Sequence, residues 1–272
     1  MDPVHDGAWN MAADELLLEQ VWRREEAVLR LYRWIRPAWS LGRTQAYEGS
    51  VDETFCRSKG IDIVRRPTGG WALLHDRELT YALAAPSTEG AFAGSVLETY
   101  RKISGVLAGG LERLGAAVAV SSRDSRRPTG PLCFSATSAH EIVVSGGGSA
   151  GAKLVGSSQR RRRSAFLQHG SIPLEIDPEL QAGAAGLAGA PEGLHPADLS
   201  GACGRRIGFD EAAAAVVDSF ASHPGVWLFE GGWTEAERAE IERLRAERYM
   251  SVPWTRGRRR GGAIDPAWST WT

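Results

Sequence analysis

Two residues in this 272-residue chain are of a type and in a setting that suit nucleophilic chemistry: a cysteine expected on a loop and a rare lysine. Cys133 follows a polar stretch, residues 121–130, and a Gly–Pro pair, so we expect it on a loop, where reactive side chains collect. A thiol with an ordinary pKa of about 8.5 needs nearby positive charge to become a good nucleophile at neutral pH. Lys153 is one of three lysines among 32 basic residues and lies in a glycine-rich, apolar stretch. Since arginine supplies the other charges, the pattern predicts a role for Lys153 that needs a compact ammonium.

The cysteines also have a plainer interpretation. Cys56, Cys133 and Cys203 are too few and too scattered for a disulfide framework, and no CxxC pair indicates zinc, so we predict no metal site. An isolated cysteine is most often a small buried packing residue. We expect that role for Cys56, in a short helix that ends at Gly60, and for Cys133 the packing role stays open as an alternative.

A second candidate site is the segment 65–70, RRPTGG. Paired glycines after a strand allow close backbone approach to a ligand, and adjacent arginines suit a carboxylate, a phosphate or an acidic partner surface. A glycine turn with solvated arginines explains the segment equally well. Neither GxxxxGK[ST] nor a helix-opening GxGxxG is present, so the motifs do not support nucleotide binding.

The third candidate is the pair of segments 153–160 and 167–172. Small residues after Lys153, among them Gly156 and Ser157, leave the face of a predicted strand open for a ligand. His169 is a possible general base, although a strand histidine that is simply hydrogen-bonded is the commoner case.

Composition excludes several classes of protein. The net charge of −1 argues against a dedicated nucleic-acid binder. No apolar run approaches the roughly 18 residues that span a bilayer, and the N-terminus shows no secretion signal. We therefore expect a cytoplasmic protein with neither nucleic acid nor membrane as partner.

Hydrophobic periodicity predicts four main helices, at 10–24 with Asn10 as N-cap, 96–114, 209–220, and 235–249 with a capping box from Thr234 to Glu237. Alternating apolar residues predict the strands 29–34, 61–66, 71–75, 79–84, 116–120, 141–144, 153–157 and 165–174. The strands 71–75 and 79–84 are expected to form a hairpin. Because strands cluster instead of alternating with helices, the pattern predicts an α+β fold whose mixed, largely antiparallel sheet is flanked by helices.

The remaining segments are expected to be irregular. We predict a solvated basic run at 160–163 and a loose connection from 178 to about 196. The chain, 1–272, is expected to be a single catalytic domain with its core at about 9–250 and a loose tail at 251–272.

Taken together, these segments resemble the lipoate–biotin protein ligase family over about residues 9 to 250. The motifs that carry the resemblance are collinear and at compatible spacing: Asn10-Met11-Ala12, Leu41-Gly42-Arg43-Thr44-Gln45, Arg65-Arg66-Pro67-Thr68-Gly69-Gly70 with His75, Lys153-Leu154-Val155-Gly156-Ser157, and Gln168-His169-Gly170-Ser171. The segments 65–70, 74–76 and 78–81, with the context Leu132-Cys133-Phe134, are similar to the octanoyltransferase branch.

The resemblance implies a biotin-synthetase-like fold with an acyl tunnel against Gly69-Gly70, no cofactor, and an acyl-thioester on Cys133 whose pKa Lys153 lowers. It implies octanoyl acyl carrier protein as donor and a lipoyl-domain lysine as acceptor, in a glycine-cleavage H protein or a dehydrogenase acyltransferase subunit. The implied substrate-binding residues are Arg66, Thr68, Gly69, Gly70, His75, Gly156, Ser157 and His169. The insertion 146–152 and the bulky Trp71 depart from the pattern of the relatives and leave the acyl length open.

Three other functions remain as alternatives. An ATP-dependent lipoate–protein ligase shares the Arg-Gly-Gly and lysine motifs, needs no cysteine, and often has an additional C-terminal domain. An amidotransferase would move octanoyl between lipoyl domains with the same cysteine. A non-catalytic relative would bind lipoyl domains or acyl carriers and would form no covalent adduct.

Overall fold

The computed structural model describes residues 2–24, 26–121, 140–189 and 197–257. Its centre is a six-stranded antiparallel sheet whose strands lie in the order β1 (Val28–Tyr32), β5 (Glu78–Pro86), β9 (Ala165–Pro173), β8 (Lys153–Arg162), β7 (Ile142–Val144) and β6 (Val118–Val120). A smaller sheet beside it has the order β3 (Asp62–Arg65), β2 (Ala38–Leu41) and β4 (Leu73–His75), with β2 parallel to β3 and antiparallel to β4. The predicted mixed, largely antiparallel architecture is confirmed.

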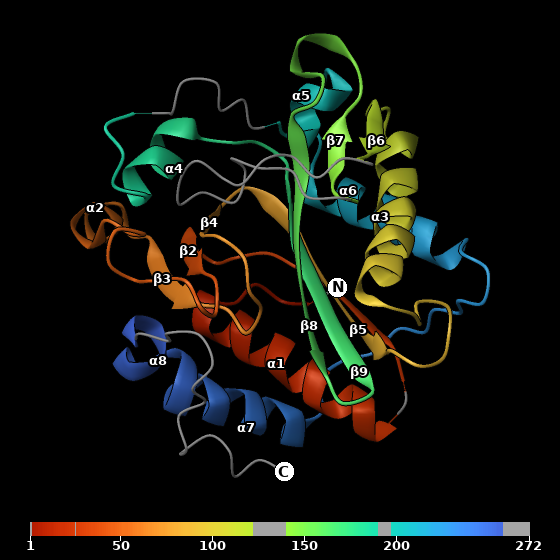
Figure 1. The fold of residues 1–272 in the computed structure, drawn as a ribbon, viewed down its shortest axis with the longest axis horizontal. Coiled ribbons are helices and arrows are strands. Elements are labelled where there is room, and N and C mark those ends of the chain that lie inside the picture. Colours follow the sequence, from red (N-terminus) through yellow and green to blue (C-terminus); the bar gives the residue numbers. More distant parts are fainter. Residues whose placement is uncertain (1, 25, 122–139, 190–196, 258–272) are drawn as a thin grey trace.

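Helices cover both faces of the large sheet (Figure 1). One face packs on α3 (Val96–Arg113) and α6 (Phe209–Ala221), and the other on α1 (Gly7–Arg24), which α7 (Glu235–Leu244) and a π-helical turn (Arg245–Tyr249) cover from outside. Helix α8 (Val252–Arg256) packs on β3 and on the π-helical turn. Short helices complete the chain: α2 (Glu53–Lys59), α4 (Pro178–Ala184), α5 (Leu199–Cys203) and a 3-10 turn (Gly147–Ser149). No helix among the described residues is both long enough and apolar enough to cross a membrane.

Strand β5 shows why the sheet is covered on both sides. Successive side chains of a strand point to opposite faces, and both sets on β5 are buried. Leu79, Tyr81 and Leu83 belong to the core with α3 and α6, whereas Ala82 and Ala84 belong to the core with α1. The first part of the face toward α1 is polar instead, and this part positions the candidate site.

The main helices and the packing role of Cys56 are confirmed. Helices α3 and α6 lie where periodicity predicted them, and α7 begins with the predicted capping box, in which the hydroxyl of Thr234 accepts from the N–H of Glu237. Cys56 is fully buried in a cluster under the small sheet, and Gly60 ends its helix in a left-handed conformation.

The expected hairpin of 71–75 and 79–84 is wrong. Strand β4 pairs with β2 in the small sheet, and β5 pairs with β1 and β9 in the large one. The turn between them therefore carries the chain from one sheet to the other. The N-cap assigned to Asn10 is also wrong, because α1 begins at Gly7 and the carboxylate of Asp6 accepts from the N–H of Trp9.

Three segments expected to be irregular contain ordered structure. Helix α4 lies inside the connection predicted to be loose, and 190–196 lie outside the described residues. The tail was placed too early: Trp254 on α8 is buried and donates its indole N–H to the backbone oxygen of Arg65. The basic run extends β8, where Arg160 and Arg162 face α1 and pair with Glu15 and Glu19.

Candidate active site

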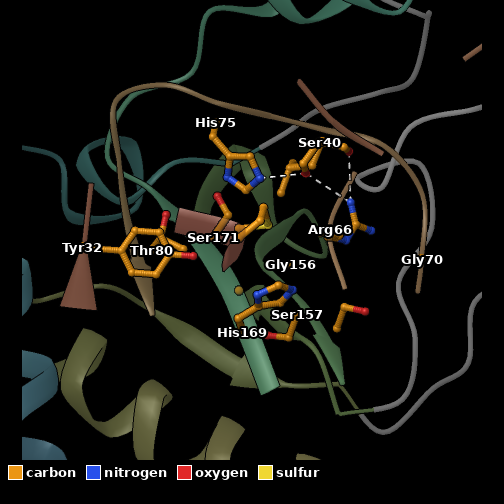
Figure 2. Close-up of a pocket in the computed structure, with 14 residues that line it drawn as sticks. Tyr32, Ser40, Arg66, Gly70, His75, Thr80, Gly156, Ser157, His169 and Ser171 are labelled. Atoms are coloured by element: carbon orange, nitrogen blue, oxygen red, sulfur yellow. Dashed lines mark hydrogen bonds between the residues drawn. The ribbon is translucent and has the colours of Figure 1, made fainter. Parts of the chain in front are cut away.

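A pocket opens where the polar part of the α1-facing sheet surface meets the small sheet (Figure 2). Its empty space, counting the part open to solvent, is about 420 Å³. It is lined by Met11, Tyr32, Ser40, Arg66, Gly70, Leu73, His75, Thr80, Gly156, Ser157, Ser158, His169, Gly170 and Ser171. Residues of α1, β1, β2, β4, β5, β8 and β9 and of the segment 66–70 therefore line one cavity.

The first histidine of the pocket, His75, is held between a hydroxyl and a carboxylate. Its Nε2 lies 2.8 Å from Ser40 Oγ and its Nδ1 lies 2.7 Å from Glu78 Oε1. The ring of Trp34 stacks on the imidazole with 4.1 Å between centroids. Glu78 also accepts from the hydroxyls of Ser171 and Thr80 and, at 3.1 Å, from the indole N–H of Trp34. The hydroxyl, the imidazole and the carboxylate of Ser40, His75 and Glu78 are called the Glu78 triad below.

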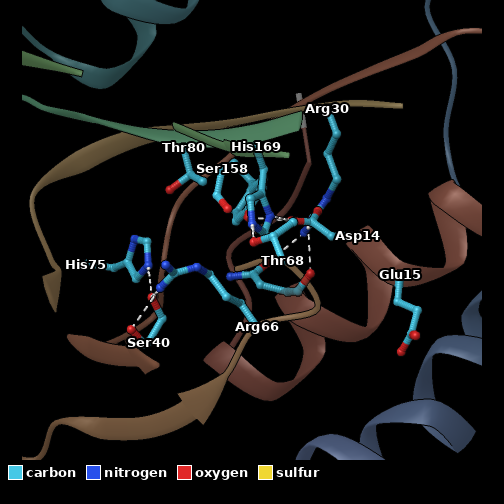
Figure 3. Close-up of polar contacts among 12 residues, drawn as sticks. Asp14, Glu15, Arg30, Ser40, Arg66, Thr68, His75, Thr80, Ser158 and His169 are labelled. Atoms are coloured by element: carbon cyan, nitrogen blue, oxygen red, sulfur yellow. Dashed lines mark hydrogen bonds and ion pairs between the residues drawn. The ribbon is translucent and has the colours of Figure 1, made fainter. Parts of the chain in front are cut away.

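The second histidine, His169, has the same arrangement with different partners (Figure 3). Its Nε2 lies 2.6 Å from Thr68 Oγ1 and its Nδ1 lies 2.8 Å from Asp14 Oδ2. Asp14 forms a buried ion pair with Arg30 at 2.7 Å and accepts from the hydroxyl of Tyr32 at 2.9 Å. We call Thr68, His169 and Asp14 the Asp14 triad.

The charges of the carboxylates determine the tautomers of both histidines. Burial raises the pKa of Asp14, but the hydrogen bond from His169 and the charge of Arg30 outweigh burial, and the net shift is downward. Burial likewise raises the pKa of Glu78, and His75 with the neighbouring hydroxyls reverses that shift. Both carboxylates are therefore ionised at neutral pH and only accept, so each histidine carries its proton on Nδ1. Each Nε2 is then the acceptor of a hydroxyl proton.

Burial also lowers the pKa of His169, and it does so despite the opposing influence of Asp14. His169 is accordingly neutral at neutral pH.

Arg66 shapes the glycine turn at the pocket mouth. Its guanidinium donates to the backbone oxygens of Ser40, Gly69 and Trp71 at 3.0, 2.7 and 2.8 Å, and to Ser40 Oγ at 3.2 Å. Gly70 has φ of +91°, and a Cβ there would lie 2.8 Å from Arg66 Nη2. Glycine is thus required at Gly70 both by its backbone conformation and by the close approach of the guanidinium.

The neighbouring Arg65 has a structural role, which corrects the expectation that both arginines face a ligand. It is fully buried and donates to the backbone oxygens of Gly42 and Gln45. It also donates to the backbone oxygen of Thr255, a residue of α8. Arg65 therefore joins the loop after β2 to the C-terminal helix.

Lys153, Cys56 and Cys203 do not line the pocket. Lys153 is buried, forms an ion pair with Glu141 at 2.7 Å, and starts the strand that reaches the pocket three residues later at Gly156. It is not among the lining residues. Cys133 lies outside the described residues. Burial raises the pKa of Cys56 to about 11 and also raises the pKa of Cys203, so neither thiol ionises readily at neutral pH.

Sequence comparison identifies the family. Residues 6–221 match the model of the lipoyl protein ligase A/B catalytic domain. The chain belongs to this family. It is 37% identical to Octanoyltransferase LipM of Kyrpidia tusciae and 39% identical to that of Symbiobacterium thermophilum, and in both cases the match covers 91% of this chain and 93% of the relative.

Solved structures share the fold of this family member. A bipartite lipoate protein ligase from Thermoplasma acidophilum superimposes with a TM-score of 0.77 at 19% identity, covering 97% of both chains. A lipoate-protein ligase A bound with ATP gives a TM-score of 0.76 at 19% identity, covering 95% of this chain and all of the other. At this identity the likeness supports the fold alone.

The structure brings together the residues that the resemblance implied for substrate binding. Most of them line the pocket, and Thr68 and Gly69 contact lining residues through hydrogen bonds. Sequence reasoning missed the groups that orient the pocket residues, which are Asp14, Ser40, Glu78, Ser158 and Ser171, and it also missed Glu141, the partner of Lys153. Glu78 had a local signal, three residues after His75. Asp14 had none, because it lies in the middle of an amphipathic helix.

Proposed function

We propose that this chain transfers an octanoyl group from acyl carrier protein to a lysine of a lipoyl-domain protein, through a thioester on Cys133. Octanoyl transfer is the activity in the names of curated relatives that match nearly the full length of the chain. The donor, the acceptor and the covalent intermediate go beyond those names. The observation that carries the proposal is this near full-length match, and Cys133 is assigned as the nucleophile in preference to Cys56 and Cys203 because burial raises the pKa of both of those thiols.

In the first half of the reaction the Cys133 thiolate attacks the carbonyl carbon of the octanoyl thioester. A carbon–sulfur bond to Cys133 forms, and the bond to the carrier's phosphopantetheine sulfur breaks, so the carrier leaves as a thiolate that takes up a proton. Lys153 favours the ionised thiol in this proposal, and Glu141, at 2.7 Å, fixes the position of the ammonium. Because a thioester is converted to an amide in the complete reaction, no nucleotide is needed.

The pocket residues bind the acyl chain and the groups around its carbonyl. Its walls combine apolar surface from Met11 and Leu73 with the backbone of Gly70 and Gly156 and with serine and threonine hydroxyls. The proposed acceptor is a lipoyl-domain lysine, whose amine attacks the acyl-enzyme in the second half of the reaction.

Intact mass spectrometry after mixing with octanoyl carrier protein tests the proposal. We expect the mass of one octanoyl group on the wild type and on Cys203→Ser, and no gain on Cys133→Ser. Lipoyl domain should then remove the adduct without ATP. Loading of Cys133→Ser, or transfer only when ATP and free octanoate are supplied, would contradict the mechanism and favour the ligase alternative.

A further inference from the structure

We propose that His75 accepts the proton that the attacking amine loses, with the hydroxyl of Ser40 as the relay between them. The inference rests on the proposed function, because it concerns the second half of that reaction. It assigns distinct roles to the two histidines of the pocket: the Glu78 triad moves a proton, and the Asp14 triad holds the site together.

The geometry of the Glu78 triad meets the requirements of a proton relay. A relay needs a hydroxyl in the pocket, a base hydrogen-bonded to it, and a third group that orients the base. Ser40 lines the pocket, and its Oγ accepts from Arg66 and donates to His75 Nε2. One lone pair of Oγ is then left for a proton arriving from a substrate, and Glu78 orients the imidazole through Nδ1.

The local charges favour His75 over His169 as the group that becomes positive. Within the described residues, Glu78 forms no ion pair with an arginine or a lysine, and its other hydrogen-bond donors are neutral. A proton on His75 therefore creates a buried imidazolium–carboxylate pair where an uncompensated carboxylate stood, which is favourable at low dielectric. Asp14, by contrast, is already paired with Arg30, which also pairs with Asp2, so a proton on His169 would gain less from its carboxylate.

Charged groups other than Glu78 also act on His75. Arg66 opposes a positive His75, but it acts across Ser40, whereas Glu78 is in direct contact at 2.7 Å. The lowered pKa of His169 agrees with the assignment, since a proton there is disfavoured by burial. The titratable or charged groups of the elements packed around His75 are Asp14, Tyr32, Arg66, Asp76, Arg77, Glu78 and His169.

The acceptor lysine loses two protons, one to solvent and one to the relay. The acceptor lysine loses a first proton to solvent and attacks the octanoyl carbonyl as a neutral amine. A carbon–nitrogen bond forms, the bond to the Cys133 sulfur breaks, and Cys133 leaves as a thiolate. The nitrogen loses its second proton to Ser40 Oγ while the hydroxyl proton of Ser40 passes to His75 Nε2, and His75 later releases it to water.

Single-turnover kinetics separate this inference from the proposed function. Each protein is first loaded with octanoyl on Cys133 and isolated, and the loaded protein is mixed with lipoyl domain while the amide is followed by intact mass. Only the loaded fraction of each protein is compared, and we expect loaded His75→Gln and loaded Ser40→Ala to transfer about 100-fold more slowly than loaded wild type or worse, as is usual when a general base is lost. His223→Gln, whose ring stacks on Phe92 away from the pocket, is the matched control and should behave as wild type.

Chemical rescue supplies a readout that a merely structural role would not change. Added imidazole should accelerate His75→Gly, which tests the role in a variant with an empty position.

The outcomes are distinct. Failure of the wild type to gain octanoyl on Cys133 would overturn the proposed function itself. Unchanged transfer by loaded His75→Gln, no acceleration of His75→Gly by imidazole, or an octanoyl adduct mapped to Ser40 would overturn the relay and leave the acyltransferase intact.

Discussion

The two triads lie in one pocket and have the same order of groups, yet their carboxylates are held in different ways. Asp14 comes from α1 and is paired with Arg30 of β1, so the Asp14 triad links the helix, the large sheet and the glycine turn. Glu78 is held by hydroxyls and an indole, and its triad joins the two sheets. The same hydrogen-bond pattern therefore serves two purposes, and a buried cation beside the carboxylate distinguishes them.

The largest effect should follow from removing that cation. Arg30→Met leaves Asp14 and Asp2 buried without their shared partner, and breaking a buried ion pair costs about 3–5 kcal/mol. Urea denaturation measures the loss. Arg36→Met is the control, because its pair with Asp62 is largely exposed and contributes about 1 kcal/mol at most. Equal losses in the two variants would mean that Arg30 does not brace the Asp14 triad.

A smaller effect is expected from Gly70→Ala, which disturbs the neighbourhood of the Glu78 triad only. The left-handed backbone at Gly70 costs about 1–2 kcal/mol with a side chain, and the methyl group also displaces the guanidinium of Arg66 from Ser40. Gly69→Ala should stay within about 0.5 kcal/mol, since nothing lies within 4 Å of its added Cβ. Thermal unfolding of the two variants measures the difference. Equal losses of stability for Gly70→Ala and Gly69→Ala would contradict a specific requirement for glycine at position 70.

Removing one hydroxyl from each triad makes the comparison direct. Ser40→Ala and Thr68→Val each leave a histidine Nε2 without its donor, and each should lower stability by about 1 kcal/mol. Only Ser40→Ala is expected to slow acyl transfer from the loaded enzyme by a large factor. If Thr68→Val slowed transfer as strongly, the two triads would share the proton-moving role.

The smallest expected change is in how the free energy of unfolding varies with pH when His169 is replaced. Because the pKa of His169 is lowered on folding, the unfolded chain binds this proton first as the pH falls. The contribution of His169 is complete above its ordinary pKa of about 6.5 and is lost as the pH drops toward the folded value. Denaturation at a series of pH values should show a flatter dependence in His169→Gln than in wild type, and an identical dependence would contradict the assignment.

Many elements of the fold were predictable because their signals are local. Helices α3, α6 and α7 follow from the spacing of apolar residues and from caps, and β4, β5, β8 and β9 overlap strands predicted from alternation, whereas β2, which carries Ser40, was not predicted as a strand. The pairing of strands was harder: the short link between β4 and β5 predicted a hairpin, yet the two strands belong to different sheets. Local patterns do not encode which neighbour a strand finds.

The residue types of the site came from the sequence, and their partners came from tertiary structure. The motifs identified His75, His169 and the glycine turn, and in the structure His169 and Ser171 lie on one face of β9 because side chains alternate along a strand. Only the packing of α1 on that face brought Asp14 to His169, across 155 positions of the chain. A carboxylate so far away in sequence leaves no periodic signal, because burial of a helix face is decided by apolar area and not by which single polar group it carries. The ion pair of Asp14 with Arg30, which distinguishes the surroundings of His169 from those of His75, is therefore decided by tertiary packing.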